Sequence, residues 1–203
     1  MRHWQVYPPD DDTFLLLGAA LALVAPGERV LEVGCGSGFI SARLASRAEV
    51  TGTDINPHAL RQSRQAGVTD VVRADLLCGI RGPFDTVIFN PPYLPTRPEE
   101  RVDGWLGYAL DGGEDGTAVI RRFAAQVGRV LAPGGRILLL VSSLSDPSRV
   151  RDTFSGQGFS CSVYSEYRME GETLFVFVFT ATGEGQKRDR QARGIFLNSR
   201  AGA

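Results

Sequence analysis

The motif Asn90-Pro91-Pro92-Tyr93 follows a short apolar run and combines residue types that suit group transfer to a flat nitrogen. The nitrogen of an amide or an exocyclic amine is a poor nucleophile, because its lone pair is delocalised into the adjacent π system. The Asn90 side-chain oxygen and the Pro91 carbonyl can accept hydrogen bonds from such a nitrogen, and Tyr93 can stack on the planar group. Pro91 and Pro92 stiffen the turn and offer no N–H donor. We predict that this motif is catalytic, through positioning and electrostatic alignment; a plain proline turn is the alternative.

A glycine-rich segment from Glu32 to Gly38 lies between a predicted strand and a predicted helix. Its spacing is G-x-G-x-G, rather than the G-x-G-x-x-G that binds pyrophosphate. Glycine lets the backbone approach a ligand closely, and an acid two positions before the first glycine suits a cation. We predict that Glu32, Gly34, Gly36 and Gly38 bind S-adenosylmethionine, whose amino and sulfonium groups are positive. A tight turn without a ligand is the alternative.

Acidic residues also follow the next two predicted strands. Asp54 ends the second strand, where a carboxylate can accept hydrogen bonds from both ribose hydroxyls of the cofactor, with Ile55 beside it. The alternative is that Asp54, together with Asn56, caps the next helix. Asp75 follows the third strand and could meet an adenine amino group while Leu76 packs on the ring.

The elements that must position these residues alternate between apolar strands and helices from about residue 13 to 150, which predicts βαβ units and a parallel sheet. The catalytic motif then follows a central strand at its carboxyl end, where open α/β sheets bind ligands. Strands are predicted over residues 29–33, 50–54, 70–73, 85–89, 136–142, 159–167 and 173–180, the last two as an antiparallel hairpin. Helices are predicted from the acidic cluster at 10–12 to before Pro26, from Gly38 to about 47, from Asn56 to Gly67, over 118–131 and from Asp146 onward, with an irregular stretch over 90–116.

Composition indicates one globular domain. The chain has 203 residues, a net charge of −1 and 43 % hydrophobic residues, which excludes collagen, coiled coil and wholesale disorder. The longest apolar stretch, residues 14–25, is shorter than the roughly 20 residues that span a bilayer, and no signal peptide is visible. We predict a domain over residues 1–182 that does not associate with a membrane.

Residues 183–203 differ in composition from the rest, with five basic and two acidic side chains and no apolar periodicity. We predict a disordered, solvated tail rather than a nucleic-acid contact. The three cysteines, Cys35, Cys78 and Cys161, are far apart and form no C-x-x-C motif. No metal site and no disulfide framework are therefore expected, and a reducing, cytoplasmic location fits best.

Taken together, the Glu32–Gly38 segment and Asn90-Pro91-Pro92-Tyr93 resemble class I S-adenosylmethionine-dependent methyltransferases that act on planar NH2 groups. More narrowly, the chain is similar to HemK/PrmC-type release-factor glutamine methyltransferases over about residues 5–181. Three further stretches carry this resemblance, at 6–17, 53–57 and 109–116. It is closest to the short archaeal and eukaryotic branch, because the 31 residues before Glu32 are too few for the N-terminal helical domain of the bacterial enzymes.

The resemblance implies a Rossmann-like seven-stranded sheet, mostly parallel with its last strand antiparallel, and helices on both faces. It implies that Asn90, Pro91 and Tyr93 bind the substrate, the glutamine of a Gly-Gly-Gln motif in a peptide-chain release factor. It also implies a heterodimer with a small zinc-binding activator protein. The predicted edge strand at 68–72 could be its docking surface; a plain sheet edge is the alternative. The cofactor contacts carried over from the family are Thr13, Glu32, Gly34, Asp54, Asp75, Leu76 and Asn90.

Other functions remain open on the sequence alone. An adenine-N6 methyltransferase shares the motif but would need a basic surface or a further recognition domain for DNA or RNA. Lysine methylation is a second alternative, and a cofactor-binding subunit that is inactive without its partner is a third. Trp105, Tyr108 and Asp111 follow the motif, where a substrate-recognition loop would lie; a packed lid is the alternative.

Overall fold

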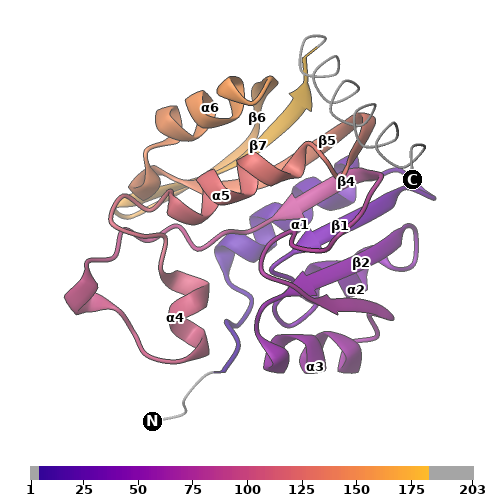
Figure 1. Ribbon diagram of the computed structural model, residues 1–203, viewed down its shortest axis with the longest axis horizontal. Coiled ribbons are helices and arrows are strands. Elements are labelled where there is room, and N and C mark those ends of the chain that lie inside the picture. The colour runs from indigo at the N-terminus through magenta and orange to yellow at the C-terminus, as the bar shows by residue number, and fades with distance from the viewer. Residues whose placement is uncertain (1–4, 183–203) are drawn as a thin grey trace, which may run out of the picture.

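The computed structural model describes residues 5–182 and shows one sheet between two layers of helices (Figure 1). Within these residues the sheet has seven strands in the order β3-β2-β1-β4-β5-β7-β6. The strands β1 to β5 pair in parallel, and β7 runs antiparallel to both β5 and β6. The strand bounds are β1 Arg29–Val33, β2 Glu49–Asp54, β3 Asp70–Arg73, β4 Phe84–Phe89, β5 Leu131–Ser142, β6 Phe159–Met169 and β7 Glu172–Ala181. The predicted fold class is confirmed, including the antiparallel last strand.

The helices cover both faces of the sheet (Figure 1). Their bounds are α1 Asp11–Leu23, α2 Phe39–Leu44, α3 Pro57–Gln65, α4 Trp105–Leu110, α5 Ala118–Val127 and α6 Pro147–Gly156. The run of apolar residues in β5 divides between the two layers: Leu138 and Leu140 pack with α1 and α2, whereas Ile137 and Leu139 pack with α5 and α6. A strand buried on both faces needs apolar residues at every position, which explains why this run does not alternate.

The predicted helix starts are confirmed by their caps. The Asp10 side chain accepts a hydrogen bond at the start of α1, and Asn56 accepts one from the His58 N–H at 2.9 Å, with Pro57 as the first residue of α3. Asp146 accepts from the Ser148 and Arg149 N–H groups at the start of α6. Short polar side chains thus satisfy the N–H groups that the first helical turn leaves unpaired.

Two predicted helix ends are wrong. The helix predicted over 118–131 ends at Val127, and Leu131 already belongs to β5, opposite Phe84 of β4. The Phe84 N–H donates to the Val130 carbonyl at 2.9 Å, so pairing with β4 replaces the last helical turn. The helix predicted to about residue 47 ends at Leu44, because the backbone there turns away: the Arg47 N–H donates to the Leu44 carbonyl at 2.9 Å, and the Arg47 carbonyl accepts from the Gly27 N–H at 2.8 Å.

The stretch predicted as irregular, 90–116, contains the six-residue helix α4 and a single 3-10 turn over Pro98–Glu100. It is pinned at its base, where the Gly112 N–H donates to the Leu94 carbonyl at 3.0 Å. An ion pair of 3.1 Å between Arg101 and Asp111 braces its middle. A helix of six residues gives too little periodicity to be predicted from sequence.

No helix within residues 5–182 has the length and apolar content needed to cross a membrane. The tail predicted over 183–203 lies outside the described residues.

Replacing Phe154 with alanine should lower the free energy of unfolding by about 3–5 kcal/mol, because its ring is fully buried and stacks on Phe179 at a centroid distance of 4.0 Å. Urea denaturation followed by circular dichroism measures this loss. Tyr164→Ala on the exposed side of β6 is the control and should cost less than about 1 kcal/mol. Equal losses for the two variants would contradict this assignment of the core.

Candidate active site

The strand register brings three chain segments together at one edge of the sheet. Val33 of β1 lies opposite Thr53 of β2 and Phe89 of β4, so the residues that follow leave the sheet side by side. They are Gly34, Asp54 and Asn90, the three positions at which the sequence predicted chemistry. This is the carboxyl end of parallel strands, where open α/β sheets bind their ligands.

A cavity of about 300 Å³ opens at this edge. Its lining includes nearly all of the predicted site: Thr13, Glu32, Gly34, Gly36, Asp54, Ile55, Asp75, Leu76, Asn90, Pro91, Pro92 and Tyr93. Gly38 does not line it. Gly38 has a φ of 77° and packs so tightly on α3 that an added Cβ would lie 2.8 Å from the Ser63 Cα. Glycine is therefore required at 38 for the turn and for helix packing.

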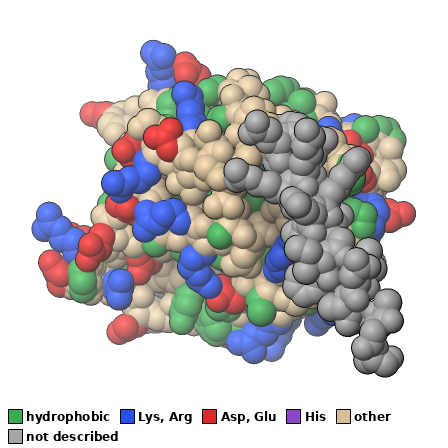
Figure 2. Space-filling view, turned by 45° about the horizontal axis from the view of Figure 1, so that its top comes forward, with side chains coloured by type: hydrophobic (Ala, Val, Ile, Leu, Met, Phe, Trp, Pro, Cys, Tyr) green, Lys and Arg blue, Asp and Glu red, His purple; other side chains and the backbone are tan. Residues whose placement is uncertain are grey.

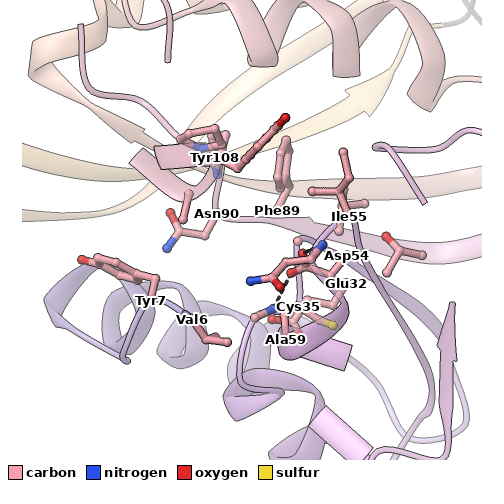
Figure 3. Close-up of a pocket in the computed structure, with 18 of the residues that line it drawn as sticks. Val6, Tyr7, Glu32, Cys35, Asp54, Ile55, Ala59, Phe89, Asn90 and Tyr108 are labelled. Carbon is pink, nitrogen blue, oxygen red and sulfur yellow. Dashed lines mark hydrogen bonds between the residues drawn. The ribbon is translucent and has the colours of Figure 1, made fainter. Parts of the chain in front are cut away.

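One side of the cavity is acidic, because the Glu32 and Asp54 side chains lie there close together (Figure 3). The buried Glu32 carboxylate accepts hydrogen bonds from the Ser41 N–H, at 2.9 Å, and from the Ser41 hydroxyl. The pKa of Glu32 is raised to about 7, mainly by burial and to a smaller extent by the charge of Asp54, against the opposing effect of the Ser41 hydrogen bonds. A desolvated acid with a raised pKa favours a cation beside it, because a positive neighbour stabilises the ionised form.

Asp54 is held rigidly on the same side. Its two oxygens accept hydrogen bonds from the Gly36 N–H at 2.9 Å and the Asn56 N–H at 2.8 Å. Burial raises its pKa, and these backbone hydrogen bonds counteract the effect. Asn56 itself caps α3, so the helix cap does not require Asp54, and each carboxylate oxygen keeps a second lone pair for a ligand hydroxyl.

An apolar wall of the cavity adjoins these two acids. Phe89 lies beneath the glycine turn, 3.4 Å from where a Cβ on Gly34 would be, and Ile55 and Leu76 also face the cavity. Asp75, about half exposed, forms an ion pair of 2.6 Å with Arg122 of α5. An apolar slot bordered by a carboxylate suits a purine ring with an amino group.

Asn90 and Tyr7 lie on the other side of the cavity (Figure 3). The Asn90 Nδ2 donates to the Asp12 carboxylate at 3.1 Å, whereas its Oδ1 is buried and has no hydrogen-bond partner among the described residues. Burial, followed by the charge of Asp12, raises the pKa of the Tyr7 and Tyr93 hydroxyls. Both tyrosines therefore remain neutral at physiological pH.

The helix α4 brings Trp105 and Tyr108 to the mouth of the cavity, with ring centroids 5.5 Å apart. Tyr108 is 63 % exposed, which leaves it available to a substrate. Asp111, predicted alongside them, does not line the cavity; it bonds the Gly113 N–H and pairs with Arg101.

The lining also contains residues that were not predicted from the sequence, among them Tyr7, Asp12, Phe89 and Arg122. Arg122 is 47 positions from its partner Asp75, and no spacing pattern links the two. Asp12 was counted as part of the acidic start of α1. A signal for it existed, because one acid suffices to cap a helix and Asp10 provides that cap.

Comparison with known proteins agrees with this fold and site. Residues 25–163 match the family described as a methyltransferase domain, which defines the class of the protein as a methyltransferase using S-adenosylmethionine. A putative protein N5-glutamine methyltransferase of Methanocaldococcus jannaschii is 33 % identical over 181 residues, covering 86 % of this chain and 91 % of the relative. The chain belongs to the protein N5-glutamine methyltransferase family.

Two further matches extend the comparison. Methyltransferase HEMK2 of Homo sapiens is 36 % identical over 192 residues, covering 86 % of this chain and 89 % of the relative. Among solved structures, a chain of the E. cuniculi Mtq2–Trm112 complex, which methylates the translation termination factor eRF1, superposes with a TM-score of 0.75 at 30 % identity. That match covers 88 % of this chain and all of the other.

The cofactor fits the cavity described here. The buried carboxylate of Glu32 would suit its positive groups, the part-buried carboxylate of Asp54 would suit its ribose hydroxyls, and the wall formed by Phe89, Ile55 and Leu76 would suit its adenine ring.

Affinity for S-adenosylmethionine should fall as the pH is lowered from 7 to 5.5. The cofactor is cationic and binds the ionised form of Glu32, whose pKa is about 7, so binding should weaken by up to about tenfold per pH unit below 7. Isothermal titration calorimetry measures this.

Glu32→Gln should bind more weakly and lose the part of the pH dependence centred near 7. Glu49→Gln, at the exposed start of β2, is the matched control and should behave like the wild-type protein. A wild-type affinity that does not change between pH 7 and 5.5 would contradict this role of Glu32.

Proposed function

We propose that this protein transfers a methyl group from S-adenosylmethionine to the side-chain amide nitrogen of a glutamine, the one in the Gly-Gly-Gln motif of a peptide-chain release factor. The observation that carries the proposal is the Asn90 Oδ1, a buried acceptor without a partner among residues 5–182, located across the cavity from two carboxylates. The names of the relatives support the choice of substrate, since several are release factor glutamine methyltransferases.

Methyl transfer requires that the lone pair of the amide nitrogen be directed at the methyl group. Asn90 Oδ1 and the Pro91 carbonyl accept hydrogen bonds from the substrate N–H groups, which increases electron density on the nitrogen and directs its lone pair toward the donor. When bound, S-adenosylmethionine would supply the methyl group, and its sulfonium sulfur would leave as a neutral thioether. The amide nitrogen held by Asn90 and Pro91 would gain the methyl group and lose one proton to solvent.

Catalysis here depends on positioning rather than on a protein base. Tyr7 and Tyr93 remain protonated because burial raises the pKa of each hydroxyl, so neither can remove a proton from the amide. Tyr93 lines the cavity beside Asn90 and can stack on the planar group. Proximity and prearranged acceptors therefore provide the rate enhancement.

The charge distribution argues against a nucleic-acid substrate. On the face shown in Figure 2, basic and acidic side chains are interspersed, rather than gathered into a basic area. Binding to a phosphate backbone depends on clustered Lys and Arg. Adenine-N6 methylation is therefore less well supported than glutamine methylation.

We also propose a small zinc-binding activator protein as a partner, and a cytoplasmic location. The solved structure with the most informative match is a complex of Mtq2 with Trm112. In this chain β3 is at the edge of the sheet, and Val72 on it is 44 % exposed. An exposed edge strand with an apolar side chain is suited to pairing with another chain.

Asn90→Ala should abolish methylation and leave cofactor affinity within about threefold of wild type, because Asn90 acts on the substrate nitrogen. Mass spectrometry of a release factor incubated with the enzyme, its activator and S-adenosylmethionine locates the added methyl. A release factor whose Gly-Gly-Gln glutamine is replaced by alanine is the substrate control and should remain unmodified. Methylation of this control, or near-normal turnover by Asn90→Ala, would refute the proposal.

Val72→Asp should prevent co-purification with a co-expressed Trm112-type activator, since a charge on the edge strand disfavours pairing. The matched control is Val163→Asp on β6, at the opposite edge of the sheet, where the side chain is 43 % exposed. If Val163→Asp prevents co-purification and Val72→Asp does not, the partner binds at the β6 edge of the sheet, and the proposed docking at β3 is contradicted.

A further inference from the structure

We propose that Asp12 is a positioning residue, whose buried carboxylate fixes the orientation of the Asn90 side-chain amide. This inference rests on the proposed function of Asn90 as the acceptor for the substrate nitrogen. Asp12 is only 5 % exposed and lines the cavity on the same side as Asn90. Because burying a carboxylate is costly, its presence there requires compensating contacts.

Those contacts are three hydrogen bonds from two residues, Thr13 and Asn90. One carboxylate oxygen accepts from the Thr13 N–H and, at 3.0 Å, from the Thr13 hydroxyl. The other accepts from Asn90 Nδ2 at 3.1 Å. The Tyr7 hydroxyl also interacts with this carboxylate. The position in the first turn of α1 favours the charge further, since the helix N-terminus is the positive end of its dipole.

This arrangement leaves one orientation for the Asn90 amide. An ionised carboxylate only accepts hydrogen bonds, so it selects the NH2 group of Asn90 and excludes the carbonyl oxygen. The oxygen is then left buried and without a partner among the described residues. Rotation of the amide by 180° would present NH2 to the substrate, and two donors would face each other. Asp12 therefore determines that the cavity offers an acceptor.

The role of helix cap does not explain Asp12. Asp10 caps α1, and Asp11, which is exposed, adds a second acid to the first turn. Asp11 does not line the cavity, so it provides a control with the same charge change in the same turn.

Asp12→Asn should reverse the Asn90 amide. If the substituted side chain at position 12 keeps its oxygen toward Thr13, its NH2 group faces the Asn90 amide. The Asn90 amide must then turn its oxygen toward that NH2 group. We expect kcat to fall about 10- to 100-fold, the loss typical of a charge-assisted hydrogen bond, while the cofactor Kd changes less than about threefold. Asp11→Asn should retain wild-type kcat and Kd.

The reciprocal exchange distinguishes positioning from a merely structural role. In Asn90→Asp, two carboxylates face each other and turnover at pH 8 should be low. In the double variant Asp12→Asn/Asn90→Asp, the NH2 at 12 donates to the acid at 90, whose second oxygen is again a free acceptor. Its kcat should exceed the product of the two single effects by at least about tenfold. A kcat equal to that product would overturn the inference, as would full activity of Asp12→Asn.

A readout without substrate separates this inference from the proposed function. The Asn90 side-chain NH2 signals in a ¹⁵N–¹H spectrum, assigned by their loss in Asn90→Asp, should shift in Asp12→Asn and stay in place in Asp11→Asn. Unchanged signals in Asp12→Asn would overturn the inference even if the enzyme methylates release factors. If the wild-type protein with its activator methylates no release factor, the proposed function fails, and the spectra still decide whether Asp12 orients Asn90.

Discussion

The proposed chemistry depends on one unfavourable arrangement, the Asn90 acceptor that is buried without a hydrogen-bond partner among residues 5–182. Leaving the Asn90 oxygen unpaired costs on the order of 1–3 kcal/mol, and folding must offset this elsewhere. An amide nitrogen, however, reacts only when its N–H groups are held and its lone pair is directed. A free acceptor that is already in place avoids reorganisation during the reaction. Energetically unfavourable arrangements of this kind are therefore found at catalytic sites.

The rest of the fold places this acceptor across the cavity from the Glu32 and Asp54 carboxylates. Parallel pairing of β1 with β2 and β4 makes the glycine turn, Asp54 and Asn90 emerge together, and the apolar core on both sheet faces keeps that register rigid. In the proposed arrangement, the Glu32 and Asp54 carboxylates attract the positive cofactor on one side. On the other, neutral tyrosines and the start of α1 surround the position of the amide. In this arrangement, the site for the cation and the site for the amide lie on opposite sides of one cavity of about 300 Å³.

Sequence predicts those parts of the site that are set by local rules. The glycine turn and the helix caps at Asn56 and Asp146 depend on neighbouring residues and are found where predicted. The apolar run predicted as a strand over 136–142 is also a strand, but β5 begins earlier, at Leu131. The end of α5 was missed because cross-strand pairing of Leu131 overrides helical periodicity. Asp12 was missed for a related reason: its partner Asn90 is 78 residues away, and only the tertiary fold brings the two together.

A crystal structure with S-adenosylhomocysteine and a Gly-Gly-Gln peptide tests the central claim most directly. The account predicts that the glutamine amide nitrogen lies about 3 Å from the Asn90 Oδ1 and faces the cofactor sulfur, with Asn90 Nδ2 on Asp12. If the glutamine side chain binds away from Asn90, or meets its NH2 group instead of its oxygen, the account is contradicted.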